Sequence, residues 1–169
     1  MKKIPLTQGF VAIVDDEDFE RLKAFKWHAV RTRQTLVVYA GRTVLTARGK
    51  RRVLMHREIL GASRGELVDH RDRDGLNNGR KNLRHCDRFQ NAYNRVKVRL
   101  TKTSRFQGVS WYAPTKRWKA QIQAAGKKRG LGYFRSEEAA ARAYDTAARE
   151  LHGAFAVPNF PVETRAASA

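Results

Sequence analysis

The segment that most restricts the fold of this chain is residues 68–91, VDHRDRDGLNNGRKNLRHCDRFQN. An Asp–His pair closes one short run, and a loop rich in Gly, Asn and Asp separates it from a second run at residues 83–86. Turn-forming residues at this density predict a chain reversal between two strands. Asp87 is then the expected N-cap of a short helix that carries Asn91, with Asn94 one turn further along. The segment predicts a strand–loop–strand–helix unit.

Four side chains of this segment form a set suited to hydrolysing a phosphodiester with one divalent metal ion. Mg²⁺ takes one or two protein oxygens, and Asp69 and Asn91 can supply them. His70, with an ordinary pKa of about 6.5, is suited to take a proton from water near neutral pH. We expect Asn82 to hold the His70 ring in its productive tautomer. Because neighbours on a strand point to opposite faces, a local kink or turn is required for Asp69 and His70 to serve one site.

The loop between the two runs carries four basic side chains suited to phosphate: Arg71, Arg73, Arg80 and Lys81. Each part of the segment has an ordinary explanation by itself. DGLNN is most often a plain turn, a His beside an Asp is usually just hydrogen-bonded, and an Asn on a helix is usually solvated. Their combination at this spacing, in a strongly basic chain, favours the functional interpretation.

The charge of the chain identifies its class of partner. Its 169 residues hold 35 Lys and Arg against 16 Asp and Glu, a formal net charge of +19. Residues 1–96 have 21 basic and 11 acidic side chains, and residues 97–169 have 14 and 5. Polyanions are the expected partner of such a chain, and both halves are expected to contact one. An RNA-binding protein of ribosomal type would explain the charge but not residues 68–91.

Other features of the composition exclude several classes of protein. Cys86 is the single cysteine, so it is interpreted as a buried small hydrophobe, and a disulfide framework or cysteine-based zinc site is excluded. No apolar run approaches the roughly 20 residues of a membrane span. The N-terminal MKKIPLTQGF has no apolar stretch of the kind found in a signal peptide. We therefore expect a soluble cytoplasmic protein with no membrane partner.

The sequence before the Asp–His pair predicts a β-rich region. Three segments are expected to form it: a strand pair over 4–14 turned at Gln8–Gly9, a helix from Asp16, and a strand pair over 35–46. The role of residues 1–52 stays open. We expect a scaffold that extends the sheet of the strand–loop–strand–helix unit and adds phosphate contacts.

Beyond a polar and basic linker at residues 97–104, the pattern indicates a second domain. Residues 106–134 predict three strands, and a helix is expected after Ser136, a good N-cap followed by two glutamates. Small and apolar residues at helical spacing would pack this helix across the sheet: Ala140, Ala143, Tyr144, Ala147 and Leu151. Eleven basic residues and no acidic one lie between positions 97 and 135. A solvated surface usually mixes signs, so this excess favours phosphate contacts.

Residues 55–94 resemble the HNH (ββα-metal) nuclease motif of phage and intron-encoded homing endonucleases. The resemblance rests on the Asp–His pair, the Asn twelve residues after the His, and the Gln–Asn pair ending nine residues later. It implies two metal ligands, a general base and the central Asn of the motif, which are Asp69 and Asn91, His70, and Asn82. The implied cofactor is one divalent ion, Mg²⁺ or Mn²⁺. His56, in LMHRE, matches a histidine of that family and is a candidate to support the nuclease site.

Residues 105–161 resemble the Apetala-2/ethylene-response-factor (ERF) DNA-binding domain of plant regulators, which also occurs fused to phage HNH nucleases. The resemblance rests on FQGVSWY, RWKAQI, LGYF, EEAAARAYDTAA and the closing NFP. It implies a three-stranded sheet laid in the major groove of double-stranded DNA. The implied DNA-binding residues are Arg105, Ser110, Tyr112, Arg117, Trp118, Lys119 and Gln121. Plant members have arginines at the positions of Ser110 and Tyr112, so weaker or different base recognition is expected.

Together these observations predict an α+β protein. Its expected parts are a nuclease domain at 1–96 with a ββα core at about 54–95, a linker at 97–104, a DNA-binding domain at 105–161 and a tail at 162–169. The expected function is that of a metal-dependent DNA endonuclease of the HNH homing type, carried by a phage or mobile element. The alternative is a non-enzymatic DNA-binding regulator with a degenerate nuclease half. The target sequence, the choice between nicking and double-strand cleavage, and the choice between monomer and dimer stay open.

Overall fold

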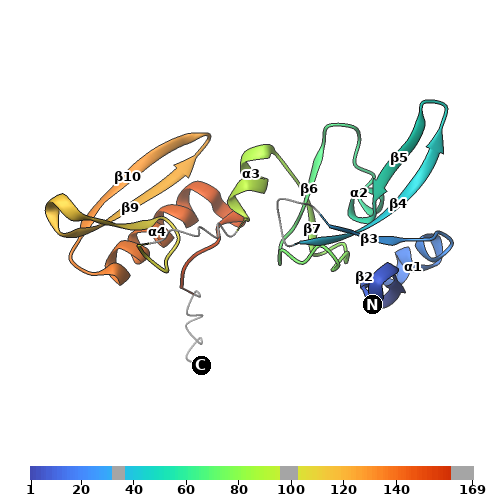
Figure 1. Cartoon of the computed structure of the whole chain (residues 1–169), viewed down its shortest axis with the longest axis horizontal. Helices are drawn as coiled ribbons and strands as arrows, with labels where there is room; N and C mark the ends of the chain where they lie inside the picture. The colour runs from blue at the N-terminus through green and yellow to red at the C-terminus, as the bar shows by residue number, and fades with distance from the viewer. Residues whose placement is uncertain (32–36, 96–102, 161–169) are drawn as a thin grey trace, which may run out of the picture. The chain divides into compact units, whose positions relative to one another are not determined.

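The computed structural model describes residues 1–31, 37–95 and 103–160 (Figure 1). The chain divides into two compact units, Met1–Asn91 (unit 1) and Ala92–Ala169 (unit 2). Helices alternate with small antiparallel sheets in both units, which confirms the α+β class. Most of the expected linker at 97–104 and all of the expected tail at 162–169 lie outside the described residues.

Unit 1 begins with a strand pair and a helix, as the sequence predicts. Strand β1 (Lys2–Pro5) pairs with β2 (Val11–Val14) around a turn at Thr7–Gly9. Helix α1 (Asp16–Lys23) starts at the predicted residue and has three acidic side chains in its first turn. Carboxylates at this end stabilise a helix through its dipole.

A three-stranded sheet follows, formed in the order β3 (His28–Arg31), β4 (Val38–Thr46) and β5 (Gly49–Leu54). The predicted strand pair within 35–46 is wrong, because the described part of this range is a single strand, β4. Its partners β3 and β5 were missed. The sheet is also separate from the strands that carry the Asp–His pair, so the expected extension of that sheet by residues 1–52 is wrong as well.

The segment of the Asp–His pair forms three elements: β6 (Leu67–His70), β7 (Leu83–Cys86) and α3 (Arg88–Tyr93). The two strands are antiparallel. The Asp87 carboxylate accepts two backbone N–H groups of the first turn of α3, which confirms it as the N-cap. The predicted strand–loop–strand–helix unit is therefore present. Cys86 ends β7 half-buried, and burial raises the pKa of its thiol to about 11.

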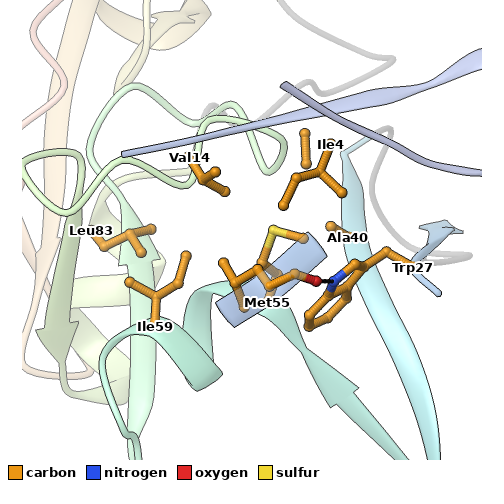
Figure 2. Packing of buried hydrophobic residues seen from close by; sticks show 9 residues of the cluster. Ile4, Val14, Trp27, Ala40, Met55, Ile59 and Leu83 are labelled. Carbon is orange, nitrogen blue, oxygen red and sulfur yellow. Dashed lines mark hydrogen bonds between the residues drawn. The ribbon is translucent and has the colours of Figure 1, made fainter. Parts of the chain in front are cut away.

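The core of unit 1 joins strands that are far apart in the sequence. Figure 2 shows Met55, at the start of helix α2 (Met55–Ile59), among Ile4, Trp27 and Ala40. The Trp27 indole N–H donates to the Leu22 carbonyl at 2.8 Å, so its polar edge is satisfied inside the core. The core also contains Leu83 of β7. The N-terminal elements therefore share one hydrophobic core with the strand pair β6–β7.

Unit 2 has the predicted sheet and helix. The strands are β8 (Val109–Tyr112), β9 (Arg117–Ala124) and β10 (Lys127–Phe134), with β9 in the centre. Helix α4 (Glu137–His152) is capped by the Ser136 hydroxyl, which accepts from the Ala139 N–H at 3.1 Å. Ala120 of β9 packs against Ala140 and Ala141 of α4, so small side chains allow helix and sheet to lie close together. In the described ranges, no helix has the length and apolar character needed to cross a membrane.

Candidate active site and nucleic-acid interface

Asp69 and His70 occupy the last two positions of β6, where the loop to β7 begins. Both side chains are buried, with 8% and 4% of their surfaces exposed. The chain turns immediately afterwards, because the Arg73 N–H donates to the His70 carbonyl and Arg73 has a φ of 69°. The pair therefore lies where the strand gives way to a turn.

Asp69 is bound by an arginine from the neighbouring strand. In the register of β6 and β7 it lies opposite Arg84. Nε and Nη2 of Arg84 donate to Oδ2 of Asp69 at 2.9 and 2.7 Å, and Arg84 is only 9% exposed. Two charge-assisted hydrogen bonds from one guanidinium hold a buried carboxylate in a fixed orientation. Sequence reasoning missed Arg84, because one arginine among many basic residues is informative only once the register is known.

The His70 ring faces Asn78, a residue of the loop that is fully buried. His70 Nε2 and Asn78 Oδ1 lie 3.4 Å apart. An amide oxygen only accepts hydrogen bonds, so Nε2 carries the proton and Nδ1 is the nitrogen that can take one. Burial, the strongest influence, lowers the pKa of His70, while Asn78 and nearby carboxylates act in the opposite direction. His70 is therefore neutral at pH 7, which is the state a general base needs.

The Asn82 side chain forms hydrogen bonds within the loop and not with the His70 ring, so the expected contact between these two residues is wrong. Its Nδ2 donates to Asp72 Oδ1 at 2.9 Å and to the Asn77 carbonyl at 2.8 Å, and its Oδ1 accepts from the Asp72 N–H at 3.1 Å. Burial raises the pKa of Asp72, but the hydrogen bonds that this carboxylate accepts lower it below its ordinary value. Asn78, four residues earlier, takes the position beside the ring. A sequence with two nearby asparagines does not reveal which one faces the His.

The same loop is attached to β2 of the N-terminal strand pair. The Ile13 N–H donates to the Leu76 carbonyl at 2.8 Å, and the Ile13 carbonyl accepts from the Asn78 N–H at 2.7 Å. Gly75 allows a close approach to β4, because a Cβ added there would lie 2.4 Å from the Val38 carbonyl oxygen. Part of the role of the N-terminal region is therefore to hold Asn78 in place.

Arg80 is exposed, but its guanidinium pairs with two carboxylates of α1. Its Nε and Nη2 donate to Asp18 of α1 at 2.7 and 2.9 Å, and its Nε also lies 2.8 Å from Glu17. Asp18 is 2% exposed. Burial raises its pKa, but hydrogen bonds and charges from Arg80 and Arg21 outweigh burial, so the pKa lies below its ordinary value. The structure therefore gives Arg80 carboxylate partners within unit 1, and its expected phosphate contact stays a prediction. Three expected phosphate contacts remain exposed on the loop, namely Arg71, Arg73 and Lys81.

His56 belongs to a cluster of rings around His70. Its ring centroid lies 4.8 Å from that of His70, edge-on, and the Tyr39 centroid lies 5.4 Å from His56 and 5.8 Å from His70. His56 is 5% exposed, and its Nδ1 has no hydrogen-bond partner in the described structure. The structure thus brings the candidate supporting histidine into direct contact with the candidate base.

The buried state of His56 predicts an acid sensitivity of unit 1. The pKa of His56 is lowered to about 3, mainly by burial and to a smaller extent by the charges of His70 and Arg57. In the unfolded chain this group binds a proton below about pH 6.5, so each pH unit between 6.5 and 3 costs the fold about 1.4 kcal/mol. Urea titrations at pH 7, 6, 5 and 4, read by hydrogen exchange of residues 1–91, should show a smaller loss in His56→Gln than in the wild type. Equal losses would mean that other groups cause the acid sensitivity.

Asn91 is half-buried on α3, where its N–H donates to the Asp87 carbonyl at 3.0 Å. Throughout residues 1–31, 37–95 and 103–160, no group of three or more His, Cys, Asp or Glu is arranged to hold a metal ion. The candidate donor pair stays the one expected from the sequence, the Asp69 carboxylate and the Asn91 amide oxygen. These hard oxygen donors fit Mg²⁺ or Mn²⁺, since Mg²⁺ needs only one or two protein ligands. One Asp69 oxygen already accepts from Arg84, so an ion at this site would share that carboxylate with a cation.

The sheet of unit 2 has one face against α4 and one outer face. Along β9, Ala120 and Ile122 are buried, so the alternating residues Arg117, Lys119 and Gln121 lie on the outer face. The register places Ser110 and Tyr112 of β8 opposite Lys119 and Arg117, on the same face. Five of the predicted DNA-binding residues therefore share one surface.

The other two predicted DNA-binding residues are placed differently. Trp118 packs partly against the core, edge-on to Trp111 at 5.1 Å, and Trp111 is the more exposed ring at 42%. Arg105 forms an exposed ion pair with Glu138 at 3.3 Å. Tyr133 of β10 was missed. It lies opposite Lys119, is 47% exposed, and its ring is 5.2 Å from Tyr112.

Comparisons with known proteins find two groups of similar proteins, and the first is viral. Protein 3.8 of Escherichia phage T7 is 36% identical over 96 residues, which cover 55% of this chain and 75% of Protein 3.8. An uncharacterized HNH endonuclease of Acanthamoeba polyphaga mimivirus is 35% identical over 92 residues, which cover 54% of this chain and 46% of that protein. No family model matches the sequence.

The second similarity is to plant regulators. An AP2-like ethylene-responsive transcription factor of Arabidopsis thaliana is 44% identical over 62 residues, or 37% of this chain. The match covers 13% of the plant protein, and an APETALA2-like protein of Oryza sativa is matched over 14% of its length. The chain therefore shares a short segment with these regulators and corresponds to less than half of the viral endonuclease.

Proposed function

This chain belongs to the family of Protein 3.8 of Escherichia phage T7, and we propose that it is a metal-dependent DNA endonuclease of the HNH type fused to an AP2-type DNA-binding domain. The observation that carries the proposal is the unit β6–β7–α3, which places buried Asp69 and neutral His70 beside a tightly bonded loop. Similarity to a viral HNH endonuclease supports the same assignment. We place its action in the cytoplasm of a bacterial host.

His70 is the proposed general base. Its Nδ1 accepts a proton from the attacking water, while Asn78 keeps the proton of Nε2 in place and the rings of His56 and Tyr39 restrict the imidazole. Asn82 keeps the loop closed through Asp72, so that Asn78 stays beside the ring. These residues position the base without contacting the DNA themselves.

Asp69 and Asn91 would hold the ion. Bound there, Mg²⁺ or Mn²⁺ would stabilise the charge that develops on the phosphate and on the leaving oxygen. Arg84 fixes the orientation of the Asp69 carboxylate through two hydrogen bonds. The exposed Arg71, Arg73 and Lys81 would contact phosphates on either side of the scissile bond.

The outer face of the unit 2 sheet is the proposed DNA-reading surface. Arg117 and Lys119 supply positive charge, and the neighbouring rings of Tyr112 and Tyr133 supply apolar surface. In the plant domains, arginines at the positions of Ser110 and Tyr112 would be suited to bind guanine. We therefore propose binding in the major groove with a base preference different from that of the plant domains.

Replacing both Arg117 and Lys119 with alanine should weaken duplex binding and reduce its salt dependence. Each lost phosphate contact lowers the slope of log K against log salt by about 0.9, so the double variant should lose about 2. The measurement is fluorescence anisotropy with a labelled duplex at several salt concentrations. Arg142→Ala with Arg149→Ala, which removes two exposed cations of α4, is the matched control. An equal effect of both variants would show that the sheet has no special role.

The proposed activity itself is tested by cleavage of supercoiled plasmid with Mg²⁺ or Mn²⁺, against EDTA. The expected product is open circle, since one chain carries one proposed site, and linear product would indicate paired cuts by two chains. The test should include DNA of the source genome, because a plasmid can lack the target. Tight duplex binding without any cutting on that DNA would replace the endonuclease with a DNA-binding regulator.

A further inference from the structure

The outer part of the β4–β5 hairpin, beyond Tyr39, concentrates exposed positive charge that the proposed active site does not use. Residues 21–57 contain no acidic side chain, and five basic ones lie on the hairpin: Arg42, Arg48, Lys50, Arg51 and Arg52. Arg42 pairs with Glu58 at the base of the hairpin. The other four are exposed and form no ion pair within the described residues. In Figure 1 the hairpin projects from the body of this unit.

Near its turn, strand β4 of this hairpin carries an apolar side chain at a position where a polar one is usual. Leu45 is 82% exposed, more than any other exposed large hydrophobic residue of the described structure. It lies opposite Lys50 in the register, and the two-residue alternation of strands places Thr43 and Arg52 on the same face. One face of the hairpin therefore combines an exposed leucine with two cations.

Protection of a sheet edge explains only part of this pattern. β5 is an edge strand, and charged residues on such strands prevent pairing with other chains. That explanation requires few charges and does not explain an exposed leucine, whereas Leu45 is 82% exposed in the second residue pair from the turn. A cationic surface without carboxylates is complementary to phosphates, and a two-stranded ribbon fits a DNA groove. Leucine is among the side chains that DNA-binding proteins place against base steps.

The hairpin is continuous with the candidate active site. β5 ends at Leu54, and α2 begins at Met55, so a single residue separates the strand from His56. The His56 ring in turn contacts His70. DNA bound along the hairpin would therefore be held by the same unit that carries the proposed base.

We propose that the β4–β5 hairpin is a DNA-binding finger of unit 1, with its exposed cations on phosphates and Leu45 against the bases in a groove. The inference takes duplex DNA as the ligand from the proposed function. It adds a binding site that is independent of the sheet in unit 2.

The charge contribution is tested by duplex binding of the full chain in EDTA, in a His70→Ala background that keeps the DNA intact. Lys50→Gln, Arg51→Gln and Arg52→Gln together should lower the salt slope by about 2 to 3 and the affinity at least tenfold. The control is Lys3→Gln, Lys26→Gln and Arg64→Gln, which removes the same charge from exposed positions elsewhere in the unit. Equal losses of affinity in the two triple variants would contradict the proposal that the hairpin binds DNA. Because cleavage is not measured, failure of the nuclease assignment would leave this result unaffected.

The contribution of Leu45 is tested separately. Leu45→Ala should weaken duplex binding about tenfold and leave the salt slope unchanged, because an apolar contact releases no counterions. Thr43→Ala, on the same face, is the control and should have little effect. Unchanged affinity of Leu45→Ala would remove the base contact from the proposal. Since the side chain is 82% exposed, loss of folding does not explain a positive result.

Discussion

Replacing His70 with alanine is expected to lower the rate of metal-dependent DNA cleavage by about 10²–10⁴-fold, the usual contribution of a positioned general base. His70 is 4% exposed, and burial keeps it neutral at pH 7. Alanine removes the nitrogen that takes the proton but leaves Asp69 and Arg84 bonded to each other. The affinity for duplex DNA should therefore change little. The measurement is the rate of supercoiled-plasmid conversion at saturating protein, with binding measured in parallel by anisotropy.

A second histidine of the same unit provides the control for this experiment. The His85 side chain is 55% exposed on β7, and its Nδ1 lies 4.0 Å from the Glu66 carboxylate. His85→Ala should cleave at nearly the wild-type rate, because this ring is exposed and lies beside the Glu66 carboxylate. Cleavage by His70→Ala at the wild-type rate would show that another group activates the water. Loss of cleavage in both variants would indicate damage to the fold instead of loss of a base.

The elements of the candidate active site could be predicted because their signals are local. Turn-forming residues between two short runs predicted the reversal from β6 to β7, and Asp87 and Ser136 were correctly identified as N-caps from their neighbours in sequence. The three strands within residues 106–134 were likewise predicted from residues inside each strand. Each of these features depends on residues within a few positions of one another.

The partners of the site residues could not be predicted, because they depend on register and tertiary contacts. Arg84 faces Asp69 only through the pairing of β6 with β7. Asn78 reaches the His70 ring because the loop bonds to Ile13, which is far away in the sequence. Arg80 meets Asp18 for the same kind of reason, and a basic residue in a loop gives no local sign of such a partner.

The strands around β4 were missed for a different physical reason. β5 reads GKRRVL, in which three consecutive charged residues hide any alternation between a buried and a solvated face. Both faces of the outer half of the hairpin are exposed, so no such alternation is needed there. The exposure that defeated the strand prediction is the same property that makes the hairpin available to DNA.

Replacing Gly108 with alanine is expected to destabilise unit 2 by about 4 kcal/mol. Gly108 has a φ of 77°, where a side chain costs about 1–3 kcal/mol. An added Cβ would also lie 2.0 Å from Cδ2 of Tyr144 and 2.7 Å from the Gln121 carbonyl oxygen. Tyr144 is 3% exposed and Gln121 belongs to the central strand, so neither can move aside easily, and such crowding costs a further 1–3 kcal/mol or so. Hydrogen exchange of residues 103–160 in urea measures the loss.

Gly9 provides the comparison that separates backbone strain from crowding. Its φ is 76°, nearly the value of Gly108, but no atom lies within 4 Å of a Cβ added there. Gly9→Ala should therefore cost unit 1 only the backbone term, about 1 kcal/mol. Similar losses in the two variants would mean that Tyr144 yields to the new methyl group. A large loss confined to Gly108→Ala should also weaken duplex binding, because the outer face with Arg117 and Lys119 exists only while β8 and β9 are paired.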